Sequence, residues 1–201
     1  MSPRPDVSEE RKQQILEAAI AVFSRLGFHK ARMDDIVEES GLSKGTLYWY
    51  FESKDDIIAS ILESLFEREF ADMGPVLSGD GSVSDRLERF MDFTITDIKR
   101  MLSLLPLAYE FYALAFRHSA VRQAIKRYLQ RYVQLLEPVI QEGIEHGEFR
   151  PVQACDAVMA LGALIEGTIL LWVYDPEVVD LDHHAKASLD LLLEGLQANT
   201  G

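Results

Sequence analysis

The chain has 201 residues, with 20 Lys and Arg against 33 Asp and Glu, so its formal net charge is −13. Its hydrophobic fraction of 48% excludes a disordered chain and predicts the core of one large domain or two small ones. The acidic balance argues against a generic nucleic-acid binder, because such proteins are basic. The single cysteine, Cys155, excludes an internal disulfide and fits a reducing cytoplasm. We expect Cys155 to be a buried structural thiol.

Apolar residues recur at helical spacing along almost the whole chain, and no alternating strand pattern is present. The chain is therefore predicted to be all-α, with about nine helices after a loose arm over residues 1–7. Ser8 opens the first helix and Gly27 ends it, while Ser43, Ser53 and Ser82 are predicted N-caps. The predicted helices cover about 8–26, 33–40, 43–51, 53–72, 82–102, 106 onward, 119–147, 157–174 and 181–197.

Proline and glycine mark two departures from regular helix. The glycine-rich segment 73–82 is predicted to be a loop. Pro138 falls inside the seventh predicted helix and should bend it near Gln134.

The segment 157–174 is 18 residues long with a single charge, so it could in principle span a membrane. Glu166 near its middle opposes insertion, and acids flank both ends without a basic cluster. We therefore expect no membrane contact and a helix that is buried in protein on more than one side.

Residues 33–51 hold the most informative pattern, a short helix, a turn with Gly41 and a second short helix. Apolar residues such as Ile36 and Leu47 would fix both helices against the first one. The remaining side chains of the second short helix suit a DNA groove, since lysine reaches phosphate or a guanine edge and tyrosine hydroxyls donate to phosphate.

Residues 12–58 resemble the DNA-binding domain of TetR-type bacterial transcriptional regulators, most specifically in the stretch GLSKGTLYWYFESK. The resemblance implies a three-helix DNA reader, followed by a helical domain that binds a small effector and forms a homodimer. Arg32 stands where the family usually has a capping threonine; it loses a side-chain cap and could add a phosphate contact. The residues that carry the resemblance are Ile15, Ala18, Ala19, Phe23, Gly27, Ile36, Gly41, Ser43, Lys44, Gly45, Thr46, Leu47, Tyr48, Tyr50, Phe51 and Lys54.

We expect residues 1–52 to form the DNA-binding domain and residues 53–201 the ligand-binding and dimerisation domain. Trp49 is the best candidate for contact within the groove, and Tyr50 and Lys54 for contact with phosphate. For Lys44 the alternative is an ordinary solvated lysine. The predicted DNA contacts are Arg32, Ser43, Lys44, Gly45, Thr46, Tyr48, Trp49, Tyr50 and Lys54.

Aromatic residues of the second domain could line a mostly apolar effector pocket, with core packing as the alternative for each of them. Glu110 and Glu166 lie in apolar runs, where each could orient a ligand or bond to backbone or a partner subunit. The predicted ligand contacts are Phe66, Phe90, Phe93, Tyr109, Tyr112, Phe116, Glu166 and Trp172.

The last two helices carry much apolar surface and small residues that permit close helix approach. We predict that they pair with their copies in a dimer, with an intramolecular bundle as the alternative. A two-fold operator requires two reading helices about 34 Å or more apart, which favours the dimer. The predicted interface residues are Ala157, Ala160, Leu164, Gly167, Leu189 and Leu193.

No residue pattern supports catalysis, a cofactor or a metal. Adjacent His183 and His184 point in different directions on a helix, and His118 and His146 are expected to be solvated. Ser-His-Asp sets, phosphate loops and HExxH motifs are absent from the sequence. A helical enzyme and a protein adaptor without DNA binding are the rival classes.

The sequence therefore predicts a cytoplasmic, homodimeric, ligand-responsive regulator of transcription, a repressor on palindromic double-stranded DNA. Two roles remain open for the ligand, release from DNA or promotion of DNA binding. Residues 1–55 contain 8 Lys and Arg and 10 Asp and Glu, a net charge of −2, so residues 56–201 carry the other −11. The acidity lies mainly outside the predicted DNA reader, and it should weaken nonspecific DNA binding.

Overall fold

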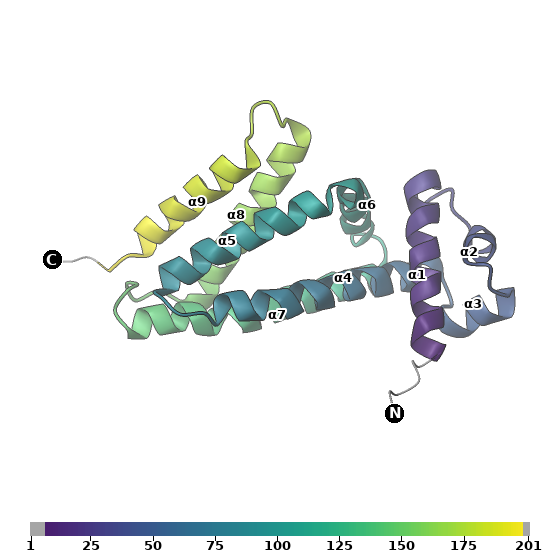
Figure 1. Ribbon diagram of the computed structural model, residues 1–201, viewed down its shortest axis with the longest axis horizontal. Helices are drawn as coiled ribbons and strands as arrows, with labels where there is room; N and C mark the ends of the chain where they lie inside the picture. Colours follow the sequence, from purple (N-terminus) through teal and green to yellow (C-terminus); the bar gives the residue numbers. More distant parts are fainter. Residues whose placement is uncertain (1–6, 199–201) are drawn as a thin grey trace. The chain divides into compact units, whose positions relative to one another are not determined.

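The computed structural model describes residues 7–198, apart from the side chains of Val7 and Ser103, and it confirms the all-α prediction (Figure 1). Within that range there are nine α-helices, one short 3-10 helix and no strand. The predicted loose arm lies outside the described residues except for Val7, where the first helix begins. The elements are α1 (Val7–Leu26), α2 (Met33–Ser40), α3 (Lys44–Tyr50), α4 (Lys54–Leu77), α5 (Val83–Arg100), η1 (Leu102–Leu104), α6 (Leu105–Leu114), α7 (Ser119–Glu145), α8 (Ala154–Tyr174) and α9 (Leu181–Leu196).

Serine hydroxyls cap three helices as predicted. The backbone N–H three residues on donates to the Oγ of Ser43, Ser53 and Ser82 at 3.1, 3.2 and 3.1 Å. Each bond satisfies an N–H that has no acceptor within its own helix. Gly27 and Gly41 end α1 and α2 with φ of 72° and 66°, the left-handed conformation that favours glycine.

The predicted loop over residues 73–82 is wrong at its start, because α4 continues through Pro75 to Leu77. Met73 and Leu77 lie one helical turn apart and are both buried, with 1% and 2% of their surface exposed. Their burial outweighs the hydrogen bond that Pro75 cannot donate. Pro138 lies within α7 as predicted.

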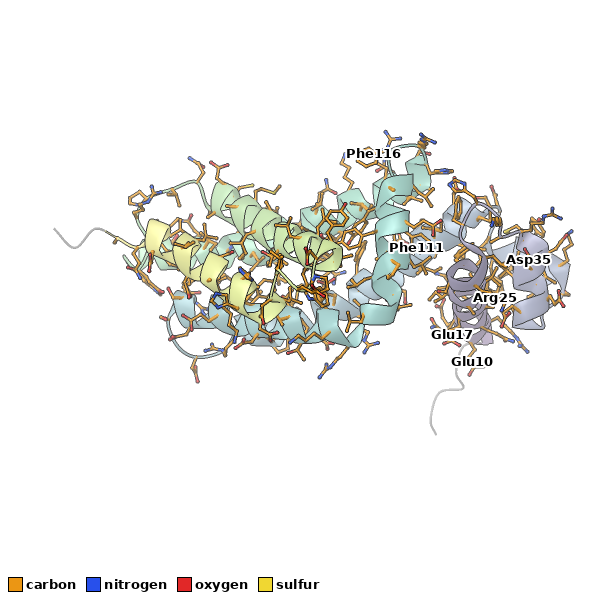
Figure 2. All side chains as sticks on the ribbon, turned by 90° about the horizontal axis from the view of Figure 1, so that it is seen from above. Glu10, Glu17, Arg25, Asp35, Phe111 and Phe116 are labelled. Carbon is orange, nitrogen blue, oxygen red and sulfur yellow. The ribbon has the colours of Figure 1, made fainter. Side chains whose placement is uncertain are left out.

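The described residues form two compact units. The first contains residues 7–67 and 103–128, and hence α1 to α3, the beginning of α4, α6 and the beginning of α7. Its core includes Phe23 of α1 and Phe111 of α6, whose rings meet edge to face at a centroid distance of 6.0 Å. Both rings are 1% exposed. Phe111 is labelled in Figure 2.

The second unit contains residues 68–102 and 129–198. Its helix α9 packs against both α5 and α8 (Figure 1). The core holds fully buried side chains such as Phe90 and Phe149. It also holds Arg86, which is 7% exposed and whose guanidinium lies 2.6 Å from the carboxylate of Glu142. A buried charge needs such a partner, because it has left water.

Three predicted environments are corrected by the structure. Cys155 is exposed, because it lies in the first turn of α8 on the side away from the buried Ala154 and Val158. His118 is half-buried, with its Nδ1 2.6 Å from Oδ2 of Asp55, so it is not a fully solvated histidine. His146 is exposed as expected.

The third correction concerns α8, which is buried on one face only. Its opposite face includes Met159, Leu171 and Tyr174, which are 50%, 57% and 75% exposed. Of the helices described here, α8 is the one long and apolar enough to cross a membrane by length and composition, a weak criterion that core helices also meet. The buried face consists of Ala154, Ala157, Val158, Leu161, Ile165, Thr168 and Ile169.

Candidate nucleic-acid interface

Helices α2 and α3 are fixed to α1 by apolar and polar contacts. Ile36 of α2 and Leu47 of α3 are fully buried in the first unit. The side-chain amide of Gln14 donates to the carbonyl of Ser40 at 2.7 Å. This bond supplies a donor to one of the C-terminal carbonyls of α2, which have no N–H partner within their own helix. The three helices therefore form a compact helix-turn-helix module.

Two aromatic side chains of α3 remain accessible at the surface of the module. Trp49 is 74% exposed and Tyr48 is 43% exposed, although both are large and partly apolar. The Trp49 ring meets the ring of Tyr50 edge to face at 4.6 Å. Gly45 is also exposed, and a Cβ at that position would contact only the Ser43 hydroxyl, at 3.8 Å. Exposed aromatic side chains beside an open backbone position suit contact with a partner molecule.

Tyr50 and Thr46, both predicted DNA contacts, are half-buried and already take part in contacts within the module. The Tyr50 hydroxyl lies 3.3 Å from Oγ of Ser8 and so connects α3 to α1. The Thr46 hydroxyl lies 2.8 Å from that of Ser43. The Tyr50 contact thus helps to hold α3 against α1, whereas the Thr46 contact lies within the start of α3 itself.

Lys44, at the start of α3, forms an ion pair with Asp34 of α2, with 2.6 Å between Nζ and Oδ1. The hydrogen bond and the charge of Asp34 raise the pKa of Lys44, so its ammonium stays charged. Both side chains are largely exposed, at 62% and 67%. Lys44 can therefore leave Asp34 for a phosphate at small cost.

Arg32 precedes α2 and makes no side-chain cap, as predicted from the replaced threonine. The carboxylate of Asp35 compensates by accepting a hydrogen bond from the backbone N–H of Arg32 at 2.7 Å. The Arg32 side chain itself is exposed. The helix start is thus stabilised from inside α2, and the guanidinium lies at the surface of the module.

Lys54, predicted to contact phosphate, lies in a different setting. Its ammonium donates to the carbonyls of Phe28 and Ala31, at 2.6 Å each, and lies 4.3 Å from the centroid of the Phe28 ring. Burial lowers the pKa of Lys54, while the carboxylates of Asp55 and Asp35 act in the opposite direction. Two of its three N–H donors are thus committed to the protein's own backbone.

The predicted ligand residues are divided between the two units. In the first unit, Tyr109 and Tyr112 contact each other edge to face at 5.9 Å. The ring centroids of Phe66 and Tyr128 lie 4.1 Å apart. Phe116, just beyond the end of α6, is 86% exposed (Figure 2). Tyr128 was not predicted, although its position on α7 is part of the helical aromatic pattern.

In the second unit, the Phe90 ring lies 6.5 Å from that of Tyr132, another aromatic residue absent from the prediction. Burial raises the pKa of Tyr132, and the negative charges of Glu69 and Glu166 raise it further. Partial loss of water around its carboxyl group also raises the pKa of Glu166, although the residue as a whole is exposed. Phe93 and Trp172 are half-buried.

A small apolar cleft with room for about one water molecule lies between α5, α8 and α9 of the second unit. None of the predicted ligand residues lines it. The lining residues are Met91, Thr94, Ile95, Ile98, Ile165, Ile169, Leu181 and Ala185.

The predicted interface residues fall into two groups. Ala157, Leu189 and Leu193 are buried within their own unit, so they belong to its core and not to its surface. Ala160 is exposed, whereas Leu164 and Gly167 are half-buried. The sequence could not show which small and apolar residues of α8 face the core, because both faces of this helix are apolar.

Among the described residues, no group of three or more His, Cys, Asp or Glu side chains is arranged to hold a metal ion. His183 and His184 are both exposed.

A three-helix module whose short α3 presents exposed side chains beyond a tight turn defines the helix-turn-helix class of DNA-binding proteins. Residues 15–61 match the family model described as bacterial regulatory proteins, tetR family, and residues 83–197 match the model described as BetI-type transcriptional repressor, C-terminal. The chain belongs to the TetR family of DNA-binding transcriptional regulators.

Similar proteins agree with this membership. The chain is 28% identical to the uncharacterized HTH-type transcriptional regulator YfiR of Bacillus subtilis (strain 168), over 99% of both chains. It is 26% identical to the fatty acid metabolism regulator protein of the same organism, over 91% of this chain and 94% of that one.

Two solved structures share the fold. One is a TetR transcription regulator from Haloarcula marismortui, with a TM-score of 0.81, 21% identity, and coverage of 94% of this chain and 99% of that one. The other is the transcriptional regulator FadR from Bacillus subtilis in complex with stearoyl-CoA, with a TM-score of 0.71, 24% identity, and coverage of 92% and 99%.

Proposed function

We propose that the protein is a homodimeric, cytoplasmic repressor that a small, largely apolar effector releases from a palindromic operator, and that it has no enzymatic activity. The observation that carries the proposal is the exposed surface of α3, where Trp49 and Tyr48 are 74% and 43% exposed and the Lys44 side chain is 62% exposed. The proposed DNA contacts are Arg32, Ser43, Lys44, Gly45, Thr46, Tyr48, Trp49 and Tyr50.

Operator binding is tested by fluorescence anisotropy with the palindrome upstream of the protein's own gene, at physiological salt. The dimer should bind this DNA specifically, and Trp49→Ala and Lys44→Ala should each weaken binding by more than about fivefold. An exposed lysine elsewhere, changed in Lys126→Ala, provides the matched control. Absence of specific binding by a verified dimer contradicts the proposal.

Dimerisation is proposed to use the exposed faces of α8 and α9. One side of α8 carries exposed or half-buried residues at successive spacings of seven, four and three, which place them on the same face of a helix. They are Ala160, Gly167, Leu171 and Tyr174. On α9, Leu191 is 70% exposed. A Cβ added at Gly167 would meet nothing within 4 Å, so a second helix can approach closely there.

The dimer is tested by sedimentation with Leu171→Glu and Leu191→Glu. Each should shift the protein towards monomer, because a carboxylate would be buried without a partner. Leu129→Glu, at a leucine that is 46% exposed on α7, is the control and should remain dimeric. Dimers of unchanged stability in both variants would exclude this interface.

The effector is proposed to be mostly apolar, in keeping with the aromatic character of the predicted ligand residues and with the fatty acid metabolism regulator among the relatives. Stearoyl-CoA is a suitable first probe, and acetyl-CoA is its control because it keeps the same polar part. Release of operator DNA by stearoyl-CoA alone supports an apolar effector site. Equal release of operator DNA by both compounds would show that the protein recognises the coenzyme A group and not the acyl chain.

A further inference from the structure

The turn between α1 and α2 is held through its backbone by side chains from two other helices. Phe28, at this turn, is 4% exposed, and its backbone N–H comes directly after the left-handed Gly27. The carboxylate of Glu110, on α6, accepts a hydrogen bond from this N–H at 3.0 Å. The left-handed Gly27 turns the chain out of α1, so the Phe28 N–H leaves the helical hydrogen-bond pattern, and a carboxylate is well suited to satisfy it.

The carbonyls of the same turn are held by a group of opposite charge. The Lys54 ammonium, in the first turn of α4, donates to the carbonyls of Phe28 and Ala31 at 2.6 Å each. A carboxylate thus holds the donor of the turn and an ammonium holds its acceptors. The charges match the groups they meet, and breaking either contact leaves a part-buried backbone group without its partner.

The Phe28 side chain lies in the same environment. The Lys54 ammonium lies 4.3 Å from its ring centroid, and the rings of Phe23 and His118 approach it at 5.8 and 5.6 Å. His118 is itself bonded to Asp55, the residue after Lys54. The turn that leads into α2 is therefore fixed by α4, α6 and the residue preceding α7, all within the first unit.

We propose that Glu110 and Lys54 are positioning residues for operator binding, which orient the α2–α3 pair by fixing the α1–α2 turn, and that neither contacts DNA. The proposal rests on the proposed DNA-binding function and replaces the phosphate contact predicted for Lys54. Because Glu110 lies within the segment that matches the C-terminal family model, a displacement of α6 would withdraw the acceptor from the Phe28 N–H.

The experiment combines two measurements on Glu110→Ala, Glu110→Gln and Lys54→Met. The first is operator affinity as a function of salt concentration, and the second is amide hydrogen exchange of residues 28–31 in the free protein. Controls of equal charge change are Glu88→Gln and Lys126→Met, at exposed positions on α5 and α7. Lys44→Ala is the comparison for a proposed phosphate contact.

Glu110→Ala and Lys54→Met should weaken operator binding by roughly tenfold, the usual effect of losing a hydrogen bond to a charged group. The salt dependence should keep its slope, because no phosphate contact is lost, whereas Lys44→Ala should reduce the slope by about one. Exchange of residues 28–31 should accelerate while that of the α1 interior stays unchanged. Glu110→Gln keeps an acceptor oxygen and should recover part of the affinity, and it also serves if Glu110→Ala fails to fold.

A slope reduced by about one in Lys54→Met assigns Lys54 to phosphate and overturns the proposal for that residue. Affinities within about twofold of the charge-matched controls overturn it for both residues, as do unchanged exchange rates. Wild-type protein that binds no operator refutes the proposed function and the operator role with it. Exchange data alone then report whether the two side chains fix the turn.

Discussion

In the proposed operator complex Asp34 competes with DNA for the ammonium of Lys44, so removal of the Asp34 carboxylate should strengthen operator binding. The two groups lie 2.6 Å apart, and both side chains are more than 60% exposed. An ion pair with this exposure is weak, and its loss should improve affinity by about two- to fivefold in Asp34→Asn. Asparagine keeps the size of the side chain, so the α2 backbone should remain unchanged.

The control for this prediction is Glu38→Gln, which removes an exposed charge from the same helix. Both changes reduce the general repulsion between α2 and DNA, and the difference between them isolates the ion pair. Operator affinity is measured by fluorescence anisotropy for the single variants and for Asp34→Asn combined with Lys44→Ala. When Lys44 is already alanine, Asp34→Asn should raise operator affinity by no more than Glu38→Gln raises it in the wild-type protein. Weaker binding by Asp34→Asn, or a full benefit without Lys44, would refute the reasoning.

Two further predictions concern the second unit. Gly143→Ala should lower the free energy of unfolding, measured by urea titration, by about 1–2 kcal/mol, because the new Cβ would lie 2.5 Å from the buried Phe149 ring. The resulting strain exceeds the gain in helix propensity. Gly74→Ala is the control and should be neutral or stabilising, because a Cβ there would meet nothing within 4 Å. Glu148→Gln should cost about 1 kcal/mol at neutral pH. Burial opposes the charge of Glu148, but hydrogen bonds from the side chain and backbone of Ser84 and from the Val83 N–H lower its pKa on balance. The wild-type advantage should therefore be present above the ordinary pKa of 4.5 and should disappear as the pH falls below it. A Glu148→Gln difference that persists unchanged at acidic pH would show that the carboxylate charge is not responsible.

The helix-turn-helix could be predicted from sequence because its determinants are local. Gly41 ends α2 and Ser43 caps α3 through contacts that span three or four residues. The end of α4 could not be predicted in the same way, since the helix there is stabilised by burial of Met73 and Leu77, which the local sequence does not reveal. Local breaking residues such as Pro75 are outweighed where burial is complete.

The environment of charged side chains was the least predictable feature. The sequence shows that Lys54 follows the short helix α3, but not that two backbone carbonyls lie 2.6 Å from its ammonium. Glu110 could have bound a ligand or backbone, and its bond to the Phe28 N–H joins residues 82 positions apart. Such pairs depend on how helices meet, which periodicity does not encode.

The most direct test of DNA reading by α3 is the accessibility of Trp49 to a quencher. Trp172→Phe leaves Trp49 as the single tryptophan of the chain, so acrylamide quenching of fluorescence reports on this side chain alone. In free protein Trp49 should be readily quenched, in keeping with its 74% exposure. Operator DNA should protect it strongly, and DNA of scrambled sequence should not. Equal quenching in the free protein and in a verified operator complex would contradict the assignment of α3 as the reading helix.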